Sequence, residues 1–334
     1  MNRRQFLQTI GAAGVVAIGL GVAGCGDRSG GAASGALTVG LTYTPDIQFA
    51  PFYVAAEHGH FADAGLDVTL RHHGANEQLF GAIQAGEEDL VYAGGAELMQ
   101  ARSQGVPLVS VATYYQEYPV VLVVAEDSPI RSAADLAGRS VGVPGPYGET
   151  WFGLLAMLKQ AGLSEQDVSV QHIGYTQQAA LSSGRVDAVM GYVNNDAVRL
   201  QAAGFAVRTL PITEATPPLI GVGLGTTDTV LAERADQVRS LQQAVAKAHA
   251  DIVADPEKAV TSSEKFIPGL AAAEQRASAL ATLNATIPLF GDAEAFGKQN
   301  PATWQAMSSF LAEMDLLSGP VEADECFTTE IVPE

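Results

Sequence analysis

The chain has 334 residues, of which 47% are hydrophobic, and a formal net charge of −19. This length and apolar content suffice for two packed lobes or for one large domain. The acidic charge argues against nucleic acid as a partner, because nucleic-acid binding requires basic patches, and it is consistent with a soluble surface.

Residues 1–24 are a predicted signal peptide rather than part of the fold. Two arginines precede an apolar, glycine-rich stretch, 10–23, which is short for a membrane span. Small residues directly before Cys25 resemble the signal of lipoproteins, in which the cysteine thiol is acylated. We therefore expect a lipid anchor at Cys25, followed by a flexible Gly/Ser/Ala-rich tether over 25–36.

Three alternatives stay open for this segment. It can be an ordinary signal peptide with a chance cysteine. The run 2–7 also resembles a twin-arginine signal, so the export route is not decided between Sec and twin-arginine. Cys326 is the only other cysteine, and it is either free or the disulfide partner of Cys25.

The stretch that follows the tether predicts strand, loop and helix. Leu37–Leu41 is an apolar run typical of a buried strand. Pro51 fixes where a helix begins, and Gly59 is a suitable residue to end it. In an open α/β sheet, the loop at the carboxyl end of the first strand borders the ligand. This loop and the helix start hold Tyr43, Asp46, Gln48, Phe49 and Tyr53.

The rest of the chain alternates before it becomes helical. Further strands are expected at 65–70, 90–92, 106–113, 120–125, 140–143, 168–172 and 188–192. Helices are expected at 76–85, 97–104, 132–137, 151–161, 176–183 and 196–203, then in a stripe over 238–252 and from Asn300 onward. This order predicts an α/β fold with mainly parallel sheet.

The stretch 43–59, together with Gly65–Val68 and Ala85–Asp89, resembles the substrate-binding proteins of ABC importers. The nearest group includes receptors for nitrate, aliphatic sulfonates, the pyrimidine precursor of thiamine, and riboflavin. The resemblance covers about residues 37–225. It implies a type II periplasmic-binding-protein-like fold, with two α/β lobes and a ligand cleft between them. The implied division is lobe 1 over 37–124 and 213–334, and lobe 2 over 125–212.

Tyrosines gather where this fold binds its ligand. Those at or just past a predicted strand end are Tyr43, Tyr92, Tyr114, Tyr147, Tyr175 and Tyr192. Tyrosine combines a flat apolar face with a hydroxyl, which suits a planar heterocycle with polar edges. The alternative is that tyrosine is simply common at strand ends.

Strand-to-helix turns provide further candidates, because backbone N–H groups at a helix start are free to bind an acceptor. The turns lie at 94–97, 142–150 and 191–196, although ordinary turn and cap chemistry also accounts for their Gly, Asn and Asp residues. The full predicted ligand set is Tyr43, Asp46, Gln48, Phe49, Tyr53, Gly95, Glu97, Tyr114, Tyr115, Tyr147, Gly148, Glu149, Tyr192 and Asn194.

The candidate loops contain no Lys or Arg. This holds over 43–53, 92–97, 113–119, 144–150 and 191–196. A sulfonate or nitrate site usually requires a fixed cation, so the loops predict a neutral ligand. The run Gln48–Tyr53 looks like the riboflavin-type members, whereas Phe49 stands where pyrimidine-precursor receptors usually place a His. We rank a riboflavin-like ligand above the pyrimidine precursor, and both above sulfonate or nitrate.

Catalytic and metal motifs are missing from the sequence. There is no His-Glu-x-x-His, no Gly-x-Ser-x-Gly and no cysteine cluster like that of the fungal pyrimidine synthases of this fold. The histidines at 58, 60, 72 and 73 are expected to be solvated on surface turns. The sequence thus predicts no catalytic residues, metal or cofactor.

Three classes of function remain at this point. The favoured one is a monomeric, lipid-anchored extracytoplasmic receptor that delivers a small molecule to an ABC permease. The others are an exported enzyme on the same fold and a sensor or adhesion lipoprotein.

Overall fold

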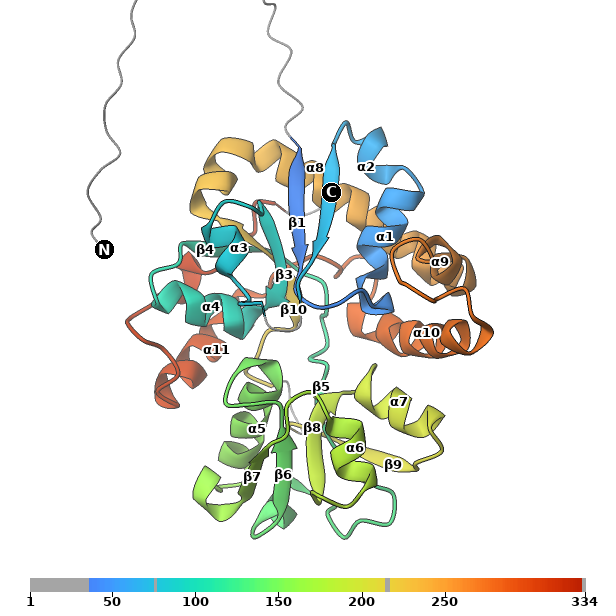
Figure 1. The fold of residues 1–334 in the computed structure, drawn as a ribbon. Helices are drawn as coiled ribbons and strands as arrows, with labels where there is room; N and C mark the ends of the chain where they lie inside the picture. Colours follow the sequence, from blue (N-terminus) through green and yellow to red (C-terminus); the bar gives the residue numbers. More distant parts are fainter. Residues whose placement is uncertain (1–35, 75–76, 214–216, 332–334) are drawn as a thin grey trace, which may run out of the picture. The chain divides into compact units, whose positions relative to one another are not determined.

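Two five-stranded sheets organise the part of the chain that the structure describes (Figure 1). The structure is a computed structural model that describes residues 36–74, 77–213 and 217–331. The predicted signal peptide, the predicted lipidation site Cys25 and the expected helix cap Asn76 lie outside these residues.

The first sheet has the strand order β2-β1-β3-β10-β4. Its strands are Val68–His72, Leu37–Leu41, Leu90–Gly94, Val222–Thr227 and Leu108–Thr113. β1 is parallel to β2 and β3, so that Val39 faces both Leu70 and Leu90. β10 is antiparallel to both of its neighbours.

The second sheet repeats this plan with the order β7-β6-β8-β5-β9. Its strands are Ser169–His172, Ser140–Val143, Ala188–Tyr192, Val120–Ala125 and Val207–Pro211. β6 is parallel to β7 and β8, and β5 is antiparallel to β8 and β9. In each sheet the antiparallel strand is the first one formed after the chain crosses from the other sheet. The predicted α/β fold with two mainly parallel sheets is confirmed.

The crossings lie between Thr113 and Val120 and between Pro211 and Val222. We call each sheet with its helices a lobe. The lobe boundary expected at 124 would leave β5 in the first lobe. β5 pairs along its length with β8 and β9 instead, so it belongs to the second lobe.

Helices cover both faces of the first sheet because its strands are apolar on both sides. Along β3, Leu90 and Tyr92 join the core under α1, α8 and α10, whereas Val91 and Ala93 join the core under α3 and α4. The helices of this lobe are η1 Ile47–Phe49, α1 Ala50–Glu57, α2 His60–Asp63, α3 Gly81–Gln84, α4 Gly95–Ser103, α8 Asp228–Ala254, α9 Pro256–Ser262, α10 Ala273–Thr286, η4 Ile287–Phe290, α11 Pro301–Glu313 and η5 Ala323–Glu325.

The second sheet is covered in the same way, with α5 on one side and α6 and α7 on the other (Figure 1). Along β8, Ala188 and Met190 pack on the α5 side and Val189 on the α6–α7 side. The helices of this lobe are η2 Ala133–Leu136, α5 Gly148–Gln160, η3 Glu165–Asp167, α6 Gln177–Ser182 and α7 Asp196–Ala202.

One apolar cluster joins the two lobes. Trp304 and Met307 of α11 belong to the same buried cluster as Met99 of α4 and Trp151 of α5. α11 begins where the sequence predicts, because the side chain of Asn300 accepts a hydrogen bond from the N–H of Ala302 at 3.0 Å. A core continuous across α4, α5 and α11 holds the lobes together behind the cleft.

The longest of the described helices is α8, with 27 residues. Its buried side chains include the predicted stripe Val238, Leu241, Val245 and Ile252, and its other faces are largely polar. Among the described helices, none combines the length and apolarity needed to cross a bilayer.

Two expected elements are displaced. Gly65 has a positive φ and ends the turn after α2, so β2 starts at Val68 rather than at 65. The helix expected over 76–85 is limited to the single turn α3, where Gly81 at the start is a weak helix former.

Candidate ligand-binding site

A cavity of about 280 Å³ lies at the carboxyl ends of strands from both sheets, close to the lower end of the roughly 300–1,000 Å³ common for ligand pockets. This is where parallel α/β sheets bind ligands, because the loops leaving neighbouring strands meet there. Its lining residues are Thr42, Tyr43, Gln48, Phe49, Leu79, Tyr92, Ala93, Gly94, Glu97, Tyr115, Pro144, Tyr147, Gly148, Glu149, Thr150, Tyr175, Gln177, Tyr192, Asn195, Asp196, Arg199 and Val222.

Helices from both lobes begin at this cavity. α5 starts at Gly148 after the extended residue Tyr147, with no side chain capping it, so its first N–H groups remain available. At the start of α4, Glu97 Oε2 accepts the N–H of Gly94 at 3.0 Å. The lining therefore contains the uncapped start of α5 and the start of α4, which Glu97 caps.

Three buried rings, Phe49, Tyr92 and Tyr115, form what we call the aromatic floor. Phe49 and Tyr92 meet edge to face with ring centroids 5.5 Å apart. Tyr115 packs edge to face on Phe290 at 5.5 Å. The floor rings are held by neighbours in the core of the first lobe, so their positions are fixed before a ligand arrives.

Three exposed rings, Tyr43, Tyr147 and Tyr175, form the aromatic rim. Their exposed fractions are 39%, 52% and 61%. Tyr43 comes from the first lobe and Tyr175 from the second, and their rings lie 6.1 Å apart with a 55° tilt. Partial burial raises the pKa of Tyr175 to about 12, and electrostatic repulsion from the neighbouring Tyr147 is the second cause of this shift. The rings of Tyr43 and Tyr175 thus meet at the cavity, and burial favours the neutral phenol of Tyr175.

Two glutamates, one from each lobe, form an acidic pair in the cavity. A Cβ at position 94 would overlap Glu149 Oε1, so glycine there lets Glu149 approach the end of β3. Among the described residues, neither carboxylate oxygen of Glu149 has a hydrogen-bond partner. Burial raises the pKa of Glu97 to about 7, although the N–H of Gly94 opposes this shift. Burial, and then the charge of Glu97, raise the pKa of Glu149 well above its usual range.

Both shifts favour the protonated form of these carboxyl groups. A protonated carboxyl offers one O–H donor and keeps an acceptor, whereas a carboxylate only accepts. The pair can therefore exchange both kinds of hydrogen bond with the edge of a ligand.

Polar contacts join the lobes beside the cavity. Arg199 of α7 donates to Asp46 Oδ2 at 2.9 Å, and Asn195 Nδ2 donates to Gln48 Oε1 at 3.2 Å. Among the lining residues that the structure describes, Arg199 alone is basic, and its charge is matched by Asp46. The candidate loops contain no Lys or Arg, but the lining includes Arg199, which lies about one helical turn beyond the loop 191–196.

Several predicted ligand residues lie behind the lining. Tyr53 is fully buried and stacks on Phe266 at 4.6 Å. Tyr114 is buried and donates its hydroxyl to Gln242 Oε1 at 2.6 Å. A Cβ on Gly95 would overlap Ile220, so this glycine serves close packing of α4.

Asn194 is also buried outside the lining. Its amide nitrogen donates to Thr286 Oγ1 at 2.9 Å and lies 3.4 Å from the hydroxyl of Tyr115. It therefore ties the loop after β8 to the end of α10 and to the aromatic floor. Asp46 does not line the cavity either, but its carboxylate accepts a hydrogen bond from the lining residue Arg199.

The remaining predicted residues do line the cavity, namely Tyr43, Gln48, Phe49, Glu97, Tyr115, Tyr147, Gly148, Glu149 and Tyr192. Tyr92 and Tyr175 line it as well, and both carried the strand-end signal. Asp196 and Arg199 are lining residues that the predicted set lacks. Their spacing of three on a helix that starts at the cleft is the signal that points to them.

The expectation of solvated histidines is wrong. His73 is buried and its Nε2 lies 2.8 Å from Glu88 Oε1. His72 lies on β2, where Nδ1 donates to the carbonyl of Tyr43 at 3.1 Å and Nε2 accepts the hydroxyl of Tyr53 at 2.9 Å. His58 and His60 both contact Asp251. Adjacent histidines look like surface turns in sequence, but their partners are distant in the chain.

Fold and cavity together define a two-lobed binding protein of the type II periplasmic architecture. Residues 46–259 match the family described as NMT1/THI5 like, and the chain belongs to this family. The family resemblance found in the sequence is confirmed.

Individual relatives agree with this assignment. The chain is 32% identical to the riboflavin-binding protein RibY of Chloroflexus aurantiacus, over 89% of this chain and 86% of that protein. It is 26% identical to the formylaminopyrimidine-binding protein of Halalkalibacterium halodurans, over 86% of this chain and 88% of that protein. The periplasmic aliphatic sulphonate binding protein SsuA of Escherichia coli has the same fold, with a TM-score of 0.69 over 87% of this chain and 91% of that one, at 19% identity.

Proposed function

We propose that this protein is an extracytoplasmic substrate-binding protein of an ABC importer, which binds a small neutral aromatic heterocycle and delivers it to a permease. The observation that carries the proposal is the combination, in one cavity between two lobes, of an aromatic floor and rim with two glutamates, one from each lobe.

The aromatic floor and rim support a planar ligand. Ring stacking contributes about 0.5–1.5 kcal/mol per pair beyond the burial of apolar area. Because Tyr43 and Tyr175 are in contact in this structure, a ligand that stacks at the mouth has to separate them. We infer that the ligand enters while the lobes are apart and is then enclosed between the rim rings and the floor.

The acidic pair supports a neutral ligand edge that both donates and accepts. An imide N–H between two carbonyls, as in a flavin ring, pairs with a protonated carboxyl through one donor and one acceptor bond. An aminopyrimidine edge pairs in the same way. Either ligand gives the oxygens of Glu149 the partners that they lack, and an unpartnered buried acceptor costs about 1–3 kcal/mol.

A sulfonate or nitrate fits this site less well. The basic side chain Arg199 is already paired with Asp46, and two carboxyl groups face the cavity. An anion placed against this pair meets like charge in a site of reduced dielectric. Between the two heterocycles we favour a riboflavin-like ligand, because the larger ring system uses more of the aromatic lining and the 32% identical relative is a riboflavin-binding protein.

Delivery follows from a ligand that contacts both lobes. Such a ligand shifts the equilibrium toward the closed arrangement. The size of this shift is limited by how much more tightly the ligand binds the closed form than the open form. The permease then recognises the closed form. Arg199–Asp46 and Asn195–Gln48 are contacts that form across the cleft when the lobes are together.

Catalysis is not part of the proposal. We infer that the protein is not an enzyme, since the relatives at 32% and 26% identity are binding proteins. Riboflavin and the aminopyrimidine, incubated with the purified protein, should be recovered unchanged by mass spectrometry. Detection of a new product would favour the exported-enzyme hypothesis over the receptor hypothesis.

Location and anchoring are proposed from the sequence. We infer export through the predicted signal peptide, acylation at Cys25 and a monomer tethered to the outer face of the membrane. After cell fractionation, wild-type protein should be in the membrane fraction and Cys25→Ala in the soluble one. Membrane retention of the Cys25→Ala variant would contradict the anchor.

A thermal-shift panel tests the receptor function. A ligand that binds the folded state raises the melting temperature by mass action. Riboflavin or the pyrimidine precursor should raise it, whereas taurine and nitrate should not. A shift with taurine or nitrate alone would favour the anion receptor, and the absence of any shift would favour a sensor or adhesion protein.

A further inference from the structure

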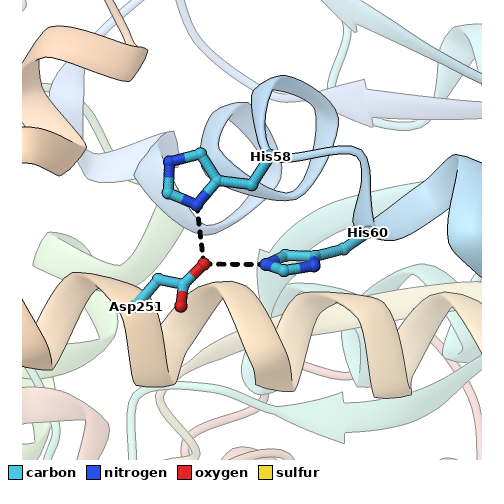
Figure 2. A group of neighbouring side chains, drawn as sticks. All are labelled: His58, His60 and Asp251. Carbon is cyan, nitrogen blue, oxygen red and sulfur yellow. Dashed lines mark hydrogen bonds and ion pairs between the residues drawn. The ribbon is translucent and has the colours of Figure 1, made fainter.

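Two histidines and one aspartate from distant parts of the chain meet outside the ligand cavity. His58 follows α1, His60 begins α2 and Asp251 lies on α8. Figure 2 shows both imidazole rings directed at the same carboxylate oxygen. His58 Nδ1 lies 2.6 Å and His60 Nε2 2.8 Å from Asp251 Oδ2.

The local backbone brings the two rings to one side. Gly59 between them has a positive φ, a left-handed conformation that reverses the chain between α1 and α2. Both imidazoles are mostly buried, while the side chain of Asp251 is 40% exposed. The cluster is therefore held in place on the protein side and open to solvent on the other.

The contacts of His58 direct its Nδ1 at the carboxylate of Asp251 and its Nε2 at Ser262. Ser262 Oγ donates to the carbonyl of Lys258 at 3.0 Å, so it accepts the N–H of His58 Nε2 at 3.1 Å. Nδ1 of His58 and Nε2 of His60 both contact Asp251 Oδ2, at 2.6 Å and 2.8 Å. These three atoms are also of the types that bind zinc, and metal binding releases the protons held between such groups.

The donor set selects the cation. Two imidazole nitrogens and one carboxylate oxygen, all within 4.8 Å of one another, match the three protein ligands of open zinc sites, in which water is the fourth ligand. Calcium and magnesium prefer oxygen donors. Zinc–ligand distances of about 2.0–2.2 Å require the donor atoms to separate by roughly half an ångström from their present spacing. Ser262 supplies the outer hydrogen bond that metal-binding histidines commonly have.

We propose that His58, His60 and Asp251 form a binding site for Zn²⁺ or a similar borderline transition metal, with Ser262 orienting His58. The metal joins the α1–α2 turn to α8, two segments that are distant in the chain. α1 begins beside the cavity and ends at this cluster, so the whole length of that helix separates the two sites. The metal site therefore stands independently of the proposed ligand.

Zinc titration by calorimetry of the purified, chelator-treated full-length protein tests the site. We expect one zinc per chain, a melting temperature that rises with zinc, and no competition from excess Mg²⁺ or Ca²⁺. Asp251→Asn, which keeps the shape of the side chain, and His60→Ala should each weaken zinc binding at least tenfold, and Ser262→Ala about tenfold.

His172→Ala is the matched control, since His172 is exposed on β7 of the other lobe. It should bind zinc like the wild type. Co²⁺ should give the strong visible absorption of a four-coordinate site in wild type and lose it in Asp251→Asn. Zinc binding that is missing in wild type, or unchanged in both Asp251→Asn and His60→Ala, would overturn the proposal.

Discussion

The aromatic floor and the aromatic rim use the same chemistry in different mechanical settings. Phe49, Tyr92 and Tyr115 are buried and packed into the core of the first lobe. Tyr43, Tyr147 and Tyr175 are exposed, and Tyr43 of the first lobe meets Tyr175 of the second. The floor is thus fixed by folding, whereas the rim is free to rearrange when a ligand arrives.

This difference separates stability from affinity. Rings that the core already holds lose little freedom on binding, but removing one also damages the fold. Rings at the mouth contribute to folding only weakly, because they bury little area without a ligand. Substitutions in the floor should therefore change both properties, and substitutions in the rim should change affinity alone.

Phe49→Ala should have the largest effect. Its ring packs on Tyr92 and His72 with centroids 5.5 Å away in each case. Truncation of a buried Phe costs about 3–5 kcal/mol, measured as the free energy of unfolding in urea. Tyr175→Ala is the control and should change the free energy of unfolding by less than about 0.5 kcal/mol. Equal losses in the two variants would remove the distinction between floor and rim.

Tyr175→Ala should instead weaken ligand binding. Loss of a stacked ring and its buried area costs about 2 kcal/mol, or roughly 30-fold in affinity. Tyr147→Ala should behave similarly. Val253→Ala, at an exposed apolar residue of α8 away from the cavity, should bind like the wild type. If both rim variants keep full affinity while their melting temperatures fall, the rim is structural and our assignment is wrong.

Glu149→Gln tests the acidic pair through pH. The pKa values of Glu97 and Glu149 are raised in the folded protein, so above about pH 4.5 the folded state holds more protons than the unfolded chain. The free energy of unfolding then falls as pH rises through 7. Glu149→Gln removes one of these groups and should flatten that slope, with a melting temperature a few degrees above wild type at pH 8.

The control for this experiment is Glu165→Gln, at an exposed position of η3. It should leave the pH dependence as in wild type. A Glu149→Gln profile that is parallel to wild type from pH 5 to 8 would mean that the carboxyl of Glu149 is ionised in the folded state at little cost.

The smallest effect is expected for the ion pair between the lobes. Arg199 is half exposed, so its bond to Asp46 is screened by solvent. The coupling between Arg199→Gln and Asp46→Asn in a double-mutant cycle of ligand affinity should be about 1 kcal/mol or less. A coupling above about 2 kcal/mol, in the upper part of the range measured for residues in contact, would make this pair, rather than the rings, the main closing contact.

Local chemistry made much of the fold and part of the cavity lining predictable. Pro51 and Gly59 delimit α1 as expected, and the strand-end rule located Tyr43, Tyr147 and Tyr192. The rule does not predict whether a ring lines the cavity or packs in the core behind it. Tyr114 and Tyr115 are consecutive and both pack in the core of the first lobe, but only Tyr115 lines the cavity.

Contacts between distant segments were not predictable from one sequence. Glu97 and Glu149 each look like a helix-start acid, and only the meeting of the two lobes brings both into one cavity. The histidines at 58 and 60 look like a polar turn until α8 brings Asp251 beside them. Sequence patterns report neighbours along an element, whereas these sites depend on tertiary packing.

The most direct test of the proposed function is a calorimetric titration of purified protein with riboflavin, the thiamine pyrimidine precursor, taurine and nitrate under identical conditions. We expect at least one of the two heterocycles to bind at one site per chain, riboflavin more tightly than the precursor, and Tyr175→Ala to weaken this binding roughly 30-fold. Binding of taurine or nitrate without either heterocycle would contradict this expectation.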